Sequence, residues 1–96
     1  MKPLEPSETD LVGKWINDRA KVVGDAVTDR IEWLTSKVLE KIGPSEESGG
    51  WDVLYRDRDD GRYWELTYPK SHMHGGGPPR LWNIAEEEAQ RKYKLS

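Results

Sequence analysis

The 96-residue chain contains no cysteine and no phenylalanine. The lack of cysteine excludes disulfide bonds, thiolate metal ligands and cysteine nucleophiles. The lack of phenylalanine means that a core has to be built from leucine, isoleucine, valine and the five tryptophans. No apolar run reaches the length of a signal-peptide core or of a membrane-spanning helix. We therefore expect a cytoplasmic protein without a membrane partner.

Sequence motifs of catalysis and of nucleic-acid binding are also missing. The glycines at 75–77 lack the GxxxxGK pattern of a phosphate-binding loop, and neither a dinucleotide fingerprint nor a serine-nucleophile motif is present. The net charge is -3, without the basic stripe that a nucleic-acid binder needs. These absences predict a protein that is not an enzyme and has no cofactor, no metal, no small-molecule substrate and no nucleic-acid partner.

The negative charge is concentrated in the middle of the chain. Residues 44–65 hold seven acidic against three basic side chains, a net charge of -4, while the remainder carries +1. Such an imbalance is typical of a protein that faces a basic partner. The alternative interpretation is an acidic surface that is only solvated.

Ninety-six residues predict a single domain over 1–96, in which residues 1–7 form an arm that is ordered only where it lies on the domain. The patterns predict strands at 8–16, 37–42, 51–56, 63–68 and 80–84, a short extended piece at 21–23, and helices from Asp25 to about residue 36 and over 85–93. We therefore expect an α+β fold, with a mainly antiparallel sheet of four to five strands, one helix after the first strand and one C-terminal helix.

Two of these boundaries have alternatives. Gly13 weakens the first strand or marks a bulge in it. The apolar spacing of the first helix continues through Val38 to Ile42, so a longer helix is the alternative to the strand at 37–42. Thr35 and Ser36 favour the earlier end because hydroxyl side chains are poor in helix interiors.

The stretch 61–80 is the most distinctive part of the chain. Alternation along 63–68 places Trp64, Leu66 and Tyr68 on one face of a strand and the three intervening side chains on the other. The pair Asp60-Gly61 supplies the left-handed position that a hairpin loop needs. Pro69 ends the strand, and the glycines and prolines at 75–79 form a corner before the next strand.

These residues resemble a known family. The stretches DGRYWELTYP at 60–69, HGGGPP at 74–79 and EEAQRKY at 87–93 are similar to the bacterial immunity protein 27 family of polymorphic toxin systems. Looser similarity covers GKW at 13–15, RIEWL at 30–34 and GW at 50–51. The resemblance implies a small cytoplasmic antidote that binds a toxin domain encoded beside it, and it implies no catalytic residues.

We expect the acidic hairpin loop from Asp57 to Asp60 and the corner from His72 to Pro79 to bind the toxin by covering a basic active-site cleft, such as that of a nuclease. The predicted partner-binding residues are Asp57, Asp59, Asp60, Glu65, His72, His74, Arg80 and Trp82. Trp33 and Trp82 either close the core or anchor a partner. Specificity alternatively lies in the loop 44–50, with the distinctive stretches maintaining the fold.

Two alternatives belong to other functional classes. His72 and His74, with Glu65 or Asp52 as a third ligand, would make a small metal-dependent enzyme, and Glu65 with His74 would make an acid–base pair. Against this, a mid-strand carboxylate such as Glu65 more often bonds an arginine across the sheet, and Arg62 and Arg80 are the nearest in sequence. The other alternative is a general module that binds peptides at a sheet edge.

Overall fold

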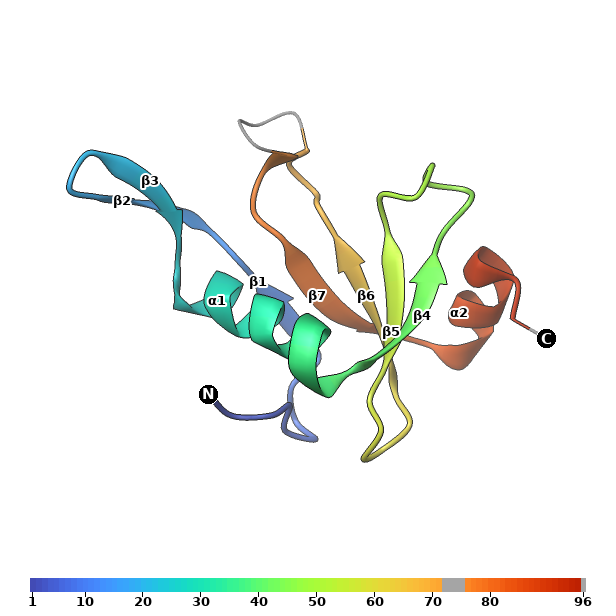
Figure 1. Cartoon of the computed structure of the whole chain (residues 1–96). Coiled ribbons are helices and arrows are strands. Elements are labelled where there is room, and N and C mark those ends of the chain that lie inside the picture. The colour runs from blue at the N-terminus through green and yellow to red at the C-terminus, as the bar shows by residue number, and fades with distance from the viewer. Residues whose placement is uncertain (72–75, 96) are drawn as a thin grey trace.

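In the computed structural model of the chain, which describes residues 1–71 and 76–95, five antiparallel strands form the main sheet in the order β1-β7-β6-β5-β4 (Figure 1). These strands are β1 (Asp10–Val12), β4 (Glu40–Pro44), β5 (Val53–Arg56), β6 (Tyr63–Thr67) and β7 (Arg80–Ile84). A separate hairpin pairs β2 (Trp15–Asp18) with β3 (Lys21–Gly24), and the helices are α1 (Ala26–Trp33) and α2 (Glu86–Tyr93). The predicted α+β class is confirmed.

The centre of the sheet follows the sequence pattern closely. β5 and β6 form the predicted hairpin, in which Arg56 pairs with Tyr63, and Gly61 has the left-handed φ of 77° that its turn requires. β7 has the predicted bounds and returns alongside β6. The C-terminal helix also forms, with Ala85 at its N-cap position.

The single strand predicted over 8–16 is wrong, because the chain breaks at Gly13 into β1 and β2. The Gly13 amide donates to the carbonyl oxygen of Pro79 at 2.8 Å. A Cβ at this position would lie 2.9 Å from that oxygen and collide with Oγ1 of Thr28. Gly13 is therefore required by a close approach of the backbone, and the β2–β3 hairpin beyond it projects from the body of the domain (Figure 1).

The first helix begins where the sequence predicts, with Asp25 at its N-cap position. A carboxylate oxygen of Asp25 accepts from the amide of Thr28 at 2.8 Å. After α1 the chain makes a π-helical turn over Leu34–Val38, in which the Thr35 hydroxyl donates to the Ile31 carbonyl at 2.9 Å. The strand then starts at Glu40 instead of residue 37, and the alternative of a helix continuing to Ile42 is wrong.

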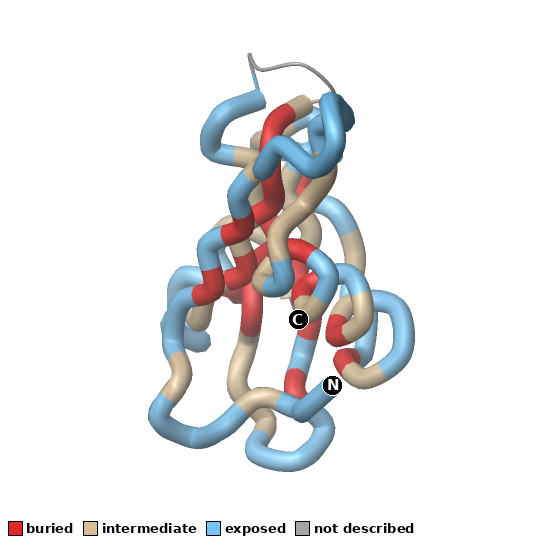
Figure 2. Tube along the Cα trace, turned by 90° about the vertical axis from the view of Figure 1, so that its left-hand side faces the viewer, coloured by how far each residue is buried: buried red, intermediate tan, exposed pale blue. Residues whose placement is uncertain are grey.

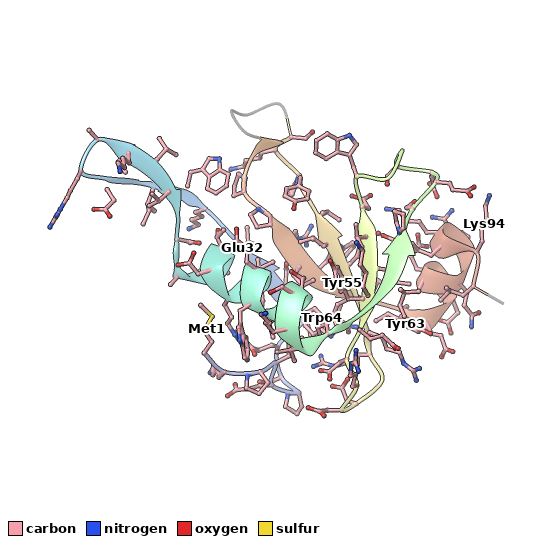
Figure 3. All side chains as sticks on the ribbon, in the orientation of Figure 1. Met1, Glu32, Tyr55, Tyr63, Trp64 and Lys94 are labelled. Atoms are coloured by element: carbon pink, nitrogen blue, oxygen red, sulfur yellow. The ribbon has the colours of Figure 1, made fainter. Side chains whose placement is uncertain are left out.

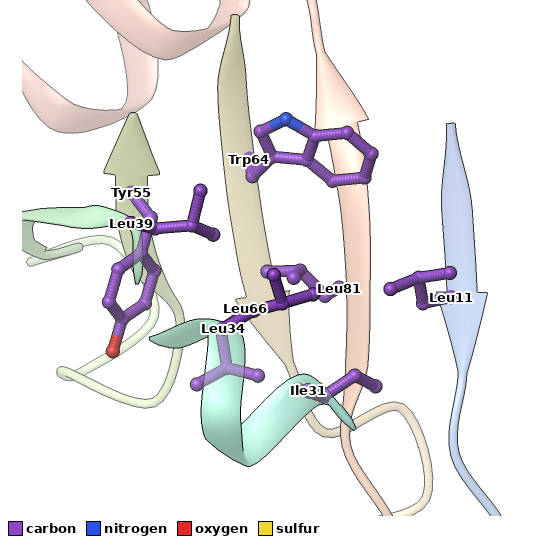
Figure 4. Packing of buried hydrophobic residues seen from close by; sticks show 8 residues of the cluster. All are labelled: Leu11, Ile31, Leu34, Leu39, Tyr55, Trp64, Leu66 and Leu81. Carbon is purple, nitrogen blue, oxygen red and sulfur yellow. The ribbon is translucent and has the colours of Figure 1, made fainter. Parts of the chain in front are cut away.

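The main sheet is covered on both faces. On one face α1 and the π-helical turn pack on a cluster shown in Figure 4, which consists of Leu11, Ile31, Leu34, Leu39, Tyr55, Trp64, Leu66 and Leu81. On the other face α2 packs through Ala89 on Leu54 and Ile84. Burial is accordingly greatest along the middle of the sheet and falls off in the loops (Figure 2). Within the described residues, neither helix has the length and apolarity that crossing a membrane requires.

The N-terminal arm at 1–7 lies against the domain through one arginine. The guanidinium of Arg30 donates to the backbone oxygens of Lys2 and Pro3, at 3.1 and 2.9 Å, and makes a two-pronged ion pair with Glu8. Leu4 also packs against the first cluster. The arm is thus held by contacts that the sequence pattern did not reveal.

Candidate partner-binding surface

The predicted partner-binding residues are spread along β6 and its two ends. The acidic loop between β5 and β6 lies at one end of this strand, and the glycine-proline corner follows its other end. Glu65 and Trp82 are paired across β6 and β7 near the middle, while Arg80 pairs with Thr67 at the corner end. His72 and His74 lie outside the described residues.

In the acidic loop, two of the three carboxylates shape the turn. Asp57 is buried, and its carboxylate accepts from the amide of Asp59 at 2.9 Å. Asp60 accepts from the amide of Arg62 at 2.9 Å and from its guanidinium at 2.7 Å. Burial alone would raise the pKa of Asp60, but these bonds outweigh it and lower the pKa. Asp59 is exposed and, within the described chain, its carboxylate has no hydrogen-bond donor.

Glu65 is buried in a polar cluster between the sheet and α2. Its carboxylate accepts from Nε1 of Trp82 at 2.9 Å and from the hydroxyl of Tyr93 at 2.8 Å, and it pairs with the ammonium of Lys92 at 2.9 Å. Lys92 also pairs with Asp52 at 2.7 Å. Burial and the Glu65 bond together raise the pKa of Tyr93 far above its ordinary value. Glu65 therefore anchors α2 to the sheet and is covered by the chain itself.

The expectation that Glu65 bonds Arg62 or Arg80 is wrong, because both arginines have other partners. Arg62 pairs with Asp60 and lies over the ring of Trp64, 4.9 Å from its centroid. Arg80 makes two hydrogen bonds of 2.9 Å to Asp10 and lies 4.5 Å from the ring centroid of Trp82. The indole of Trp82 is thus held by Glu65 and covered by Arg80, and both Trp33 and Trp82 pack partly buried against the core clusters.

The acidity of residues 44–65 is largely balanced by α2 and the residue that follows it. Three basic side chains near the C-terminus reach four carboxylates of this segment, in the pairs Arg91–Glu47, Lys92–Asp52, Lys92–Glu65 and Lys94–Glu46. The charge imbalance seen in the sequence therefore does not become an equally acidic surface.

Two observations on the described residues bear on the alternative functions, which are a metal-dependent enzyme and a module that binds peptides at a sheet edge. Residues 1–71 and 76–95 contain no group of three or more histidines, cysteines or acidic residues placed to hold a metal ion. For strand addition, β1 has only three residues, and β4 has a register shift between Lys41 and Gly43. Short and irregular edges of this kind discourage the pairing of a further strand.

Sequence reasoning missed an aromatic groove on the α1 face of the sheet. Trp51 is 59% exposed and meets Tyr68 edge to face, with 6.1 Å between ring centroids. Together with Gly50 and Gly76 these rings line a hollow of about 440 Å³. A second hollow of about 230 Å³ adjoins it through Tyr68 and is lined by Trp15 and Glu32. The signal in the sequence was a tryptophan directly after two glycines, which carry no side chain to cover it.

Comparison with known proteins gives one match. A model of the family described as immunity protein 27 matches residues 17–85, which run from β2 to the end of β7. Neither the comparison with curated proteins nor that with solved structures finds a match. Because the matched segment is most of the 96-residue chain, the protein belongs to the immunity protein 27 family.

Proposed function

We propose that this immunity protein binds a cognate toxin in the cytoplasm and neutralises it without any catalysis of its own. The family match over residues 17–85 is the observation that carries this proposal. The site geometry supports it, because Glu65, the one carboxylate common to both enzyme alternatives, is held by Trp82, Lys92 and Tyr93 and is not available to a substrate.

The mechanism we propose is occlusion of a basic cleft, such as the active site of a nuclease. Asp59 supplies the exposed carboxylate of the acidic loop, while Asp57 and Asp60 fix the shape of that loop. His72 and His74 are the other toxin contacts that we propose. Arg80, Trp82 and Glu65 act between these ends by holding the sheet and α2 in place.

Co-expression with the toxin domain encoded next to this chain tests the proposal. We expect a complex that survives purification and cells that survive the toxin only when this protein is present. A chain that neither associates with the toxin domain nor protects the cells would remove the proposal.

A charge reversal tests the contact made by the acidic loop. Asp59→Lys leaves the turn bonds of Asp57 and Asp60 in place, whereas reversing all three carboxylates would also break the loop. If the loop faces a basic cleft, Asp59→Lys slows association with the toxin roughly fivefold at low salt, because complementary charge acts mainly on the association rate. The matched control is Glu87→Lys, an exposed position on α2. Equal association rates for both variants would show that the loop is not a contact.

A further inference from the structure

The aromatic groove consists of the two adjoining hollows, and it is lined by Trp15, Glu32, Trp51 and Tyr68. It lies on the face of the sheet that α1 only partly covers, between the β2–β3 hairpin and the loop before β5 (Figure 1). The residues come from four separate elements or loops and are brought together only by the fold. Large, partly exposed aromatic side chains with glycines beside them leave room for a side chain from another molecule.

One charged group lies in this groove. Among the described residues, Glu32 is the only charged side chain that lines either hollow. It projects from α1 (Figure 3), is exposed, and has no hydrogen-bond donor or ion-pair partner for its carboxylate in the described part of the chain. Burial raises the pKa of the Tyr68 phenol, and the negative charge of Glu32 raises it further. The Glu32 carboxylate is therefore close enough to Tyr68 to influence it electrostatically.

A carboxylate beside aromatic rings is suited to a planar cation. A guanidinium stacks on the faces of tryptophan and tyrosine and at the same time forms two parallel hydrogen bonds to a carboxylate. An ammonium fits less well, because it is a compact and strongly hydrated charge without a flat face. The hollow at Glu32, with about 230 Å³, has the scale of a single large side chain rather than of a whole ligand.

We infer that this hollow receives an arginine side chain of the toxin, whose guanidinium pairs with Glu32 and lies against Trp15 and Tyr68. The backbone that carries this arginine crosses the wider hollow and contacts Trp51. The inference rests on the proposed antidote function and names the chemistry of the recognised group. It agrees with a basic toxin surface, and it places a decisive contact away from the acidic loop.

A small probe tests the hollow without the toxin. N-acetyl-arginine amide is titrated into the isolated protein while the indole N–H signals of Trp15 and Trp51 are followed by NMR, with N-acetyl-citrulline amide as the uncharged analogue of the same shape. We expect saturable shifts of the Trp15 signal with the arginine probe at millimolar concentration, since a single side chain binds weakly. Shifts of equal size with citrulline, or tighter binding of N-acetyl-lysine amide, would overturn the assignment of an arginine.

Substitution of the carboxylate provides the second arm. Glu32→Gln keeps the size of an exposed side chain, and Glu87→Gln is the same change on a helix of the opposite face. We expect Glu32→Gln to abolish the response to the arginine probe and to weaken the toxin complex about tenfold, which is the usual effect of losing one charge-assisted hydrogen bond at an interface. Glu87→Gln should change neither measurement.

The two arms separate this inference from the proposed function. If the wild-type chain binds no toxin but Glu32 still selects arginine over citrulline, the antidote proposal fails and the recognition of an arginine stands. If the toxin complex forms and Glu32→Gln leaves its affinity unchanged, the antidote proposal stands and the inference is wrong. Self-association in the wild type that is lost in Glu32→Gln would mean that the hollow takes an arginine of a second copy, which also refutes the inference.

Discussion

Replacing Glu8 by glutamine tests how the N-terminal arm is held to the domain. Both oxygens of the Glu8 carboxylate accept from the guanidinium of Arg30, at 2.6 and 2.7 Å, and one of them also accepts from the amide of Glu5 at 2.9 Å. Glutamine keeps the size of the side chain but loses its charge and one of its two acceptors. The substitution therefore removes the ion pair while leaving the packing of the arm unchanged.

The expected loss in free energy of unfolding can be worked out from the pKa of the Glu8 carboxyl. The Arg30 hydrogen bonds lower the pKa of Glu8 from its ordinary 4.5 to about 2, against the opposing effect of burial. A lowered pKa means that the native state holds the proton less tightly than the unfolded chain, so the stabilisation is present above pH 4.5 and is lost as the pH falls towards 2. A shift of this size corresponds to roughly 3 kcal/mol. The Glu8 and Arg30 side chains are 20% and 15% exposed, and solvent screening reduces this to about 2 kcal/mol.

Urea unfolding followed by tryptophan fluorescence at a series of acid pH values measures this loss. Between about pH 5 and pH 2 we expect the wild type to lose about 2 kcal/mol more free energy of unfolding than Glu8→Gln. Glu47→Gln serves as control, because the Glu47 side chain is 56% exposed and its bond to Arg91 is long, at 3.4 Å. Parallel pH profiles for the wild type and Glu8→Gln would show that the ion pair does not stabilise the fold.

Three further substitutions have outcomes fixed by the structure. Lys92→Met leaves Glu65 and Asp52 without their shared cation and should cost about 3 kcal/mol of unfolding free energy, part of which Glu65→Gln restores in the double variant. Gly13→Ala should cost about 2 kcal/mol in the same urea assay, because its Cβ overlaps the carbonyl of Pro79. The pKa of Tyr93 is raised, so its contribution is lost as the pH rises past 10, and Tyr93→Phe should flatten the alkaline fall in stability.

The parts of the fold that sequence predicts well are those decided by local chemistry. The β5–β6 hairpin depends on the Asp60-Gly61 turn and on alternation within single strands, and both are visible in the sequence. The break at Gly13 has a different origin, because it depends on the approach of Pro79 and Thr28 from distant parts of the chain. Without these contacts the alternation through residues 8–16 looks continuous, which is why one strand was predicted where two form.

The contrast between local chemistry and contacts from distant parts of the chain also explains which features of the candidate site could be predicted. Asp59 is exposed as expected for a loop, and Glu65 lies mid-strand on the face predicted for it. Its partners Trp82 and Tyr93 are 17 and 28 residues away, so nearness in sequence pointed to the wrong side chains. The exposure of Trp51 was likewise not predicted, because alternation places this residue on a face of the sheet without showing that α1 covers only part of that face.

The internal pairing of charge changes what the acidic segment can contribute to recognition. A carboxylate that is already paired with a lysine or arginine of its own chain produces only a weak electrostatic field at a distance. The two charges cancel beyond a few ångströms, and salt screens the remaining field. Most acids of residues 44–65 are in this state, whereas Glu32 and Asp59 have no such pairing within the described chain. On the proposed function, recognition of a basic toxin would therefore depend on a few unpaired carboxylates beside exposed contact surface, not on the net charge of the segment. Because Glu32 stands next to aromatic rings that would exclude water on contact, we expect its single charge to have more effect on affinity for the toxin than the larger but neutralised acidity around α2.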